Sequence, residues 1–127
     1  MKGKVDNVIK IPTTFNGIFK LWFEFLKPLH KMSPKEIDVA SALLRKRYEL
    51  SKSVLDDGIL DKLSLSTDVR KEIMKEQGLP SGHFNVVISN LKKNKFIIDD
   101  RINPRFIPRI IEDKGNFQLL FLFDFSK

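Results

Sequence analysis

Few residues in this sequence have the types and the spacing that catalysis requires. The histidines, His30 and His83, lack the paired spacing of a zinc site. The pairs Asp56-Asp57 and Asp99-Asp100 stand where turns are expected, and aspartate is common at turns for backbone reasons alone. The sequence contains no cysteine and no glycine-rich phosphate-binding loop. We therefore expect that the protein is not an enzyme and has no catalytic residues, metal site or cofactor.

Recognition of a polyanion is the chemistry that the sequence does favour. Between residues 70 and 95 the cations outnumber the acids, Glu72 and Glu76, by four. Lysine and arginine attract phosphates in a salt-dependent way, while serine and asparagine suit base edges or phosphates. The residues expected to contact nucleic acid are Arg70, Lys71, Ser81, His83, Asn85, Val86, Ser89, Asn90, Lys92, Lys93, Arg101 and Arg105.

Several of these residues also have a simpler interpretation. Asn85, Ser89 and Asn90 can form an ordinary solvent-exposed helix face. Arg105 can be ion-paired along the face of a strand. The segment 81–94 contains no arginine, the residue that most often reads guanine, so its lysines are expected to contact phosphates.

A pair of helices is expected to position these side chains. Thr67–Gln77 has the pattern of a helix, and Gly78 can adopt the positive φ with which a helix ends sharply. A second helix is predicted over 81–94, with the Ser81 hydroxyl as its N-terminal cap. Its apolar residues recur at three- and four-residue spacing, at Phe84, Val87, Ile88 and Leu91. This stripe should face the core, which leaves the polar residues facing outward.

A hairpin is predicted after the second helix. Phe96–Ile98 is rich in β-forming residues, Asp99-Asp100-Arg101 is a polar tip, and 105–111 is expected to return as a strand. Two prolines would confine that returning strand to an edge or to a bulge. The continuous apolar run within Phe117–Phe125 predicts a final strand with both faces covered.

The order of helix, glycine turn, helix and hairpin resembles a winged helix-turn-helix. Gly78 matches the turn glycine of that family, and Leu79 matches the apolar residue that follows it. Ser81 matches the small hydroxyl residue that opens the recognition helix. Phe84 and Val87 match the inward positions of that helix.

This resemblance implies that helix 81–94 enters the major groove of duplex DNA and that a wing at 96–111 reaches the backbone or the minor groove. The first helix departs from the family pattern, because Met74 stands where a small residue is usual and Gln77 where an apolar one is usual. The helix expected after Ser33 is similar to the first helix of regulators of the MarR type. The compact, lysine-rich sequence also resembles small winged-helix proteins of bacteriophages, including crAss-like phages.

Two helices and a strand are predicted in the first part of the chain. Val5–Ile11 has the pattern of a short strand, and Thr14 should cap a helix from Phe15 to about Lys27. Ser33-Pro34-Lys35-Glu36 is the pattern of a capping box that opens another helix. The inward stripe of that helix is expected to be Ile37, Ala40, Leu44 and Tyr48.

The far end of this helix is basic, through Arg45, Lys46, Arg47 and Lys52. Such a charge run is either a solvated face or a contact with a polyanion. After it, Asp56-Asp57-Gly58 is expected to form a turn and Leu63–Leu65 a short strand, as precedes the second helix in winged-helix domains.

The helix that begins at Phe15 is apolar nearly all the way round. We expect this helix to dimerise or to dock on another protein. The residues expected at that interface are Phe15, Phe19, Trp22, Phe23 and Phe25. The alternative is that the strand at Phe117–Phe125 covers the extra face. The expected segments are an N-terminal strand and aromatic helix at 1–32 and a winged helix-turn-helix domain at 33–127.

Length and composition fit a basic globular protein that is mainly α-helical with a small antiparallel β-sheet, an α+β fold. The chain has 127 residues, 42% of them hydrophobic, and a net charge of +7. Lysines and an aspartate interrupt its opening residues, so no signal peptide is expected, and Leu21–Leu26 is too short to span a membrane. We expect a protein of the bacterial or phage-infected cytoplasm, or of a virion, without a membrane partner.

Two classes of function follow from these expectations. The first is a DNA-binding protein, a transcriptional regulator that dimerises and has duplex DNA as its partner. The second is a structural adaptor in a larger assembly, such as a phage particle or replication complex, that docks through Phe15–Leu26 and Phe117–Phe125. A replication initiator shares the same expected fold.

Overall fold

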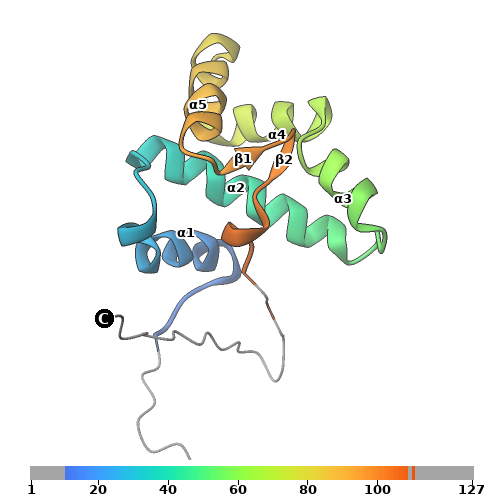
Figure 1. Cartoon of the computed structure of the whole chain (residues 1–127), viewed down its shortest axis with the longest axis horizontal. Coiled ribbons are helices and arrows are strands. Elements are labelled where there is room, and N and C mark those ends of the chain that lie inside the picture. The colour runs from blue at the N-terminus through green and yellow to red at the C-terminus, as the bar shows by residue number, and fades with distance from the viewer. Residues whose placement is uncertain (1–10, 109, 111–127) are drawn as a thin grey trace, which may run out of the picture.

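The protein is described here by a computed structural model of residues 11–108 and 110 (Figure 1). Within these residues, five α-helices and one antiparallel sheet of two strands confirm the predicted α+β class. The elements are α1 (Phe15–Phe25), η1 (Lys27–Leu29), α2 (Pro34–Ser51), α3 (Asp57–Ser64), α4 (Thr67–Gln77), α5 (Ser81–Lys93), β1 (Ile97–Ile98), β2 (Arg101–Ile102) and η2 (Pro104–Phe106), where η marks a 3₁₀ helix. None of these helices combines the length and the apolar composition needed to cross a bilayer.

Two predicted strands fall outside this part of the chain. The strand expected at Phe117–Phe125 lies entirely outside the described residues. Of the strand expected at Val5–Ile11, only Ile11 is described, and it is not in a strand.

Helix α2 is the centre of the fold, and α1, α3, α4 and α5 all pack against it (Figure 1). Its start follows the predicted capping box: Ser33 Oγ accepts from the Glu36 N–H at 3.3 Å, and Glu36 Oε1 accepts from the Ser33 N–H at 3.1 Å. Pro34 occupies the first helical position, where its missing N–H costs nothing. Burial extends beyond the predicted stripe to Val39, Ala42 and Leu43, because neighbours surround α2 on several sides.

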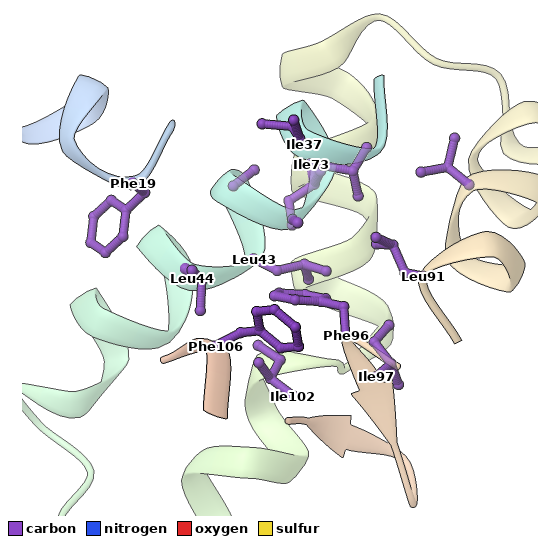
Figure 2. Packing of buried hydrophobic residues seen from close by; sticks show 14 of the residues in the cluster. Phe19, Ile37, Leu43, Leu44, Ile73, Leu91, Phe96, Ile97, Ile102 and Phe106 are labelled. Carbon is purple, nitrogen blue, oxygen red and sulfur yellow. The ribbon is translucent and has the colours of Figure 1, made fainter. Parts of the chain in front are cut away.

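Aromatic rings from distant parts of the chain meet in the core beside α2 (Figure 2). The Phe23 and Phe96 ring centroids are 5.7 Å apart, and those of Phe96 and Phe106 are 5.9 Å apart. These are spacings at which edge-on and tilted ring pairs attract each other. Helix α1 therefore belongs to the same core as the hairpin, and described residues of both expected segments, 1–32 and 33–127, contribute to it.

The interface expected on α1 needs correction. Phe19 and Phe23 are 1% and 0% exposed, so they pack inside their own chain and are not available to a partner. Trp22 is half-buried, and its Nε1–H donates to the Phe106 carbonyl oxygen at 2.8 Å. Only Phe15 and Phe25 keep about two fifths of their surface exposed, at 42% and 40%. Helix α2 and the segment that follows the hairpin cover much of α1, through the packing of α1 on α2 and the bond from Trp22 to Phe106.

The segment before α4 also differs from the prediction. Asp56 begins helix α3, because its Oδ1 accepts from the Ile59 N–H at 2.9 Å, and the following Asp57-Gly58 lies inside the helix. The strand expected at Leu63–Leu65 is replaced by the end of this helix. Asp56, which the sequence predicts at a turn, is an N-cap, a position that favours aspartate equally.

Candidate nucleic-acid interface

The turn between α4 and α5 follows the prediction. Gly78 ends α4 with φ of +63°, in the left-handed region that favours glycine. The Leu79 N–H donates to the Met74 carbonyl at 3.0 Å, a bond that closes the helix end. A Cβ on Gly78 would meet nothing within 4 Å, so backbone conformation and not space requires glycine there. Leu79 is half-buried and packs against the core.

Helix α5 begins differently from the prediction. Pro80 is its N-cap, with an extended backbone, and the Pro80 carbonyl accepts from the Phe84 N–H at 2.9 Å. Ser81 therefore lies one residue inside the helix, and no side chain caps the first turn. The expected capping role of the Ser81 hydroxyl is wrong, because a cap must precede the first helical residue. The N–H groups of this first turn keep the partial positive charge of an uncapped helix end.

The two faces of α5 are separated as predicted. The stripe of Phe84, Val87, Ile88 and Leu91 is buried in the core. On the opposite face, Gly82, Val86, Ser89 and Lys93 are exposed and follow one another at helical spacing. We call these four residues the outer stripe. No carboxylate occurs anywhere in α5.

Most residues expected to contact nucleic acid are on the surface. The exposed ones are Lys71, Ser81, His83, Asn85, Val86, Ser89, Lys92, Lys93, Arg101 and Arg105. Arg70 and Asn90 are half-buried, and the Arg70 Nε is buried without a hydrogen-bond partner among the described residues. Figure 1 shows α5 with its N-terminal end directed away from α1, and the hairpin beside its C-terminal end.

Asn90 holds α5 to α2. Its Nδ2 donates to Glu36 Oε2 at 3.2 Å, and Asn94 Nδ2 donates to Glu36 Oε1 at 3.4 Å. The carboxylate that completes the capping box of α2 thus also fixes the C-terminal part of α5. Asn90 is therefore used inside the protein, which corrects its assignment as a base or phosphate contact.

The hairpin is shorter than the predicted wing at 96–111. Ile97 pairs with Ile102 and Ile98 with Arg101, on either side of a tight turn. Both turn residues, Asp99 and Asp100, have positive φ, at 51° and 58°. Positive φ at both central positions is the type I′ geometry that suits two-residue hairpins, and aspartate tolerates it better than most residues.

The expected returning strand at 105–111 is also wrong over its described part. Arg105 lies in η2, where Asn103 Oδ1 accepts from the Arg105 N–H at 3.1 Å. Asn103 Nδ2 in turn donates to the Lys95 carbonyl at 2.9 Å. Asn103 and Pro104 therefore end β2 by starting a 3₁₀ helix. The returning strand of the hairpin is Arg101–Ile102, which precedes the predicted strand at 105–111. Arg101 is the arginine that the hairpin carries, and Arg105 follows it outside the sheet.

Two acids of α4, Glu72 and Glu76, have partners in α2. Lys46 Nζ is 2.5 Å from Glu72 Oε2 and 3.4 Å from Glu76 Oε2, and Arg45 also contacts Glu76. The hydrogen bond from Lys46 lowers the pKa of Glu72, and the same bond raises the pKa of Lys46. In addition, Arg47 Nη2 lies 3.2 Å from Asp61 Oδ1. Three of the four cations at the basic end of α2, Arg45, Lys46 and Arg47, therefore join α2 to α3 and α4.

These pairs change the local charge count. Glu72 and Glu76 reduce the surplus of cations between residues 70 and 95, yet Arg45 and Lys46 of α2 balance their charges. The positive charge of α5 and of the segment after it is therefore not offset by Glu72 and Glu76. Sequence reasoning also missed Gly82, whose position four residues before Val86 places it on the outer stripe.

Comparison of this chain with protein-family models, with curated proteins and with solved structures gives no match.

Proposed function

We propose that this protein binds duplex DNA by placing the outer stripe of α5 in the major groove. The observation that carries the proposal is the exposed, carboxylate-free face of α5, with small residues in its N-terminal half and lysines in its last turn. The major groove is about 12 Å wide and admits one α-helix. With thirteen residues, α5 is about 20 Å long, enough to lie across several base pairs.

Small side chains let the helix backbone come close to the groove. Gly82 and Ser89 add little bulk to the outer stripe, and between them Val86 is 57% exposed. An exposed valine in this position offers an apolar contact to the methyl group of thymine. Ser81 and Asn85 beside the stripe supply hydroxyl and amide groups for base edges or phosphates.

Two kinds of group in this protein would bind the phosphates of the DNA. The uncapped first turn of α5 offers backbone N–H groups and the positive end of the helix dipole. Lys92, Lys93, Arg101 and Arg105 offer exposed cations near the other end of α5 and after it. Because Arg101 stands on a hairpin of two-residue strands, it is assigned to the DNA backbone and not to the minor groove. We further propose that the protein is a winged helix-turn-helix DNA-binding protein with a role in transcriptional regulation.

The dependence of DNA binding on salt tests this function. Affinity for a random 20-base-pair duplex would be measured by fluorescence anisotropy between about 50 and 200 mM salt. Four phosphate-binding cations predict a slope of about −3.6 in log K against log salt, which is a loss of roughly a hundredfold over that range. Replacing Lys93 by glutamine should reduce the slope by about 0.9. Lys20→Gln is the matched control, because Lys20 lies on α1 and pairs with Asp38 at 3.1 Å.

Absence of binding at the lowest salt, or a flat slope, would refute the proposal. Equal effects of Lys93→Gln and Lys20→Gln would mean that the net charge attracts DNA without the α5 face. In either case, the adaptor function would be the better interpretation of the fold.

A further inference from the structure

A hollow opens on the surface where α1, α2 and the segment after η2 meet. Its volume is about 190 Å³, and it is lined by Phe19, Leu44, Arg47, Tyr48, Ser51, Ile107, Pro108 and Ile110. Two of its polar side chains already have partners, because Arg47 Nη2 pairs with Asp61 Oδ1 at 3.2 Å and Ser51 Oγ donates to the Tyr48 carbonyl at 2.5 Å. The other lining side chains are aromatic or aliphatic. A hollow of this size can hold one aromatic ring.

The apolar surface continues beyond the hollow at Phe15. The Phe15 ring centroid is 5.7 Å from that of Phe19 and 5.6 Å from that of Tyr48, so Phe15 contacts two of the lining residues. Phe15 is nevertheless 42% exposed. An exposed aromatic ring beside a hollow with apolar walls is typical of a surface that receives another apolar segment.

The described part of the chain ends on the rim of this hollow. Ile107, Pro108 and Ile110 all line it, and Figure 1 shows the chain leaving η2 beside the start of α1. The sequence continues with residues 111–116 and then with the run 117–125, in which seven of nine residues are leucine or phenylalanine. Seven Cα–Cα steps join Ile110 to Phe117 and span at most about 25 Å. The most apolar run that follows in the sequence is therefore tethered close to the hollow.

We propose that the run 117–125 docks on its own chain, with one phenylalanine ring in the hollow and neighbouring apolar side chains against Phe15. A short tether gives such a segment an effective concentration in the millimolar range. A separate protein would need a comparable concentration or a tighter contact to take its place. The proposal gives a site to the alternative in which this run covers α1, and it leaves the run unavailable as an adaptor surface. It does not depend on DNA binding, since the outer stripe of α5 is not part of the hollow.

Cross-linking between introduced cysteines tests the proposal, because the chain has none of its own. Ser51→Cys would be combined in turn with one cysteine at each position from 117 to 125, at about 10 µM protein, far below the effective concentration of a tethered segment. A disulfide requires Cβ atoms about 3.8 Å apart, so one or two positions should cross-link at least about tenfold faster than the others. The products should keep the 14.8 kDa mass of one chain. Ser89→Cys is the matched control on the exposed face of α5, and it should show no preferred position.

Thermal unfolding of the full chain gives a second, independent measurement. Phe121→Ser and Phe123→Ser together should lower the midpoint by at least about 5 °C, because apolar side chains are lost from a packed site. Leu55→Ser is the control, since Leu55 is 90% exposed, and it should shift the midpoint by less than about 2 °C. Cross-linking of Ser51→Cys no faster than that of Ser89→Cys, or a midpoint that the double variant leaves unchanged, would overturn the proposal. Cross-linked products of two chains would overturn it as well, and would assign the hollow to a second copy.

Discussion

Replacing Gly82 by alanine should stabilise the protein and weaken its binding to DNA. A Cβ at this position would meet nothing within 4 Å, and the residue has no positive φ that alanine would resist. Glycine in a helix costs about 0.5–1 kcal/mol relative to alanine, because it loses more backbone freedom on folding. For a domain of this size, that gain raises the midpoint of thermal unfolding by about 2–4 °C. Nothing within the described fold explains why a glycine stands there.

The proposed interface gives Gly82 a role, because a glycine lets the first turn of α5 approach a phosphate closely. An added methyl group on the outer stripe would hold the helix away by up to about 1 Å, which weakens contacts that depend steeply on distance. Loss of one hydrogen bond to a charged group is worth about 1.5 kcal/mol, which corresponds to roughly a tenfold lower affinity. Differential scanning fluorimetry and anisotropy titration of the same preparations measure both quantities. Ser89→Ala is the control, because it removes a hydroxyl from the same stripe without adding bulk.

The expected result for Gly82→Ala is a higher midpoint of thermal unfolding together with a lower affinity for DNA. If Gly82→Ala is more stable and binds DNA as tightly as the unaltered chain, the close approach at Gly82 is refuted. If the variant is less stable, the assignment of Gly82 to an unstrained helical turn is refuted instead.

Three further predictions concern the fold. Phe23→Ala should cost about 3–5 kcal/mol of unfolding free energy in urea titrations, since the side chain is fully buried, whereas Phe25→Ala should cost less because 40% of its surface is exposed. Glu36→Ala should cost about 1–3 kcal/mol in the same assay, since it removes the acceptor shared by two helices, and Glu36→Gln should cost less. Lys46→Gln should destabilise the protein at neutral pH. The lowered pKa of Glu72 means that this pair contributes stability above the ordinary carboxyl pKa of 4.5 and loses it as the pH falls through the lowered value. The difference between Lys46→Gln and the unaltered chain should therefore shrink as the pH falls below 4.5, and an unchanged difference would contradict the ion pair.

Structural features that depend only on neighbouring residues could be predicted from local patterns in the sequence. The capping box at Ser33 and the glycine turn at Gly78 need only a few adjacent residues, so their patterns could be recognised directly. The buried stripe of α5 follows from helical spacing alone. These features determine where α2 begins, where α4 ends and which face of α5 is buried, and they are the most accurate part of the prediction.

Features that depend on distant residues could not be found in this way. Phe23 packs in the core against Phe96, which lies more than seventy residues later and in turn packs against Phe106 of η2. Likewise, Glu72 counts as a surface acid until Lys46, on another helix, is known to bind it. The same aspartate pattern fits a turn or an N-cap, so Asp56 was assigned to the wrong element. The first two differences come from contacts between distant residues, whereas the third comes from a local pattern that fits two elements.

The short hairpin limits what the protein can do at DNA. Two residues per strand span about 7 Å, so the hairpin cannot follow a groove as a long wing does. Because Asp99 and Asp100 occupy its tip, the end nearest a phosphate would be repelled, and only Arg101 beside the tip can contact the backbone favourably. Sequence preference would therefore come from α5, and substitution of Arg101 should lower affinity for all duplexes alike. A change in preferred sequence on Arg101→Gln would show instead that the hairpin reads bases.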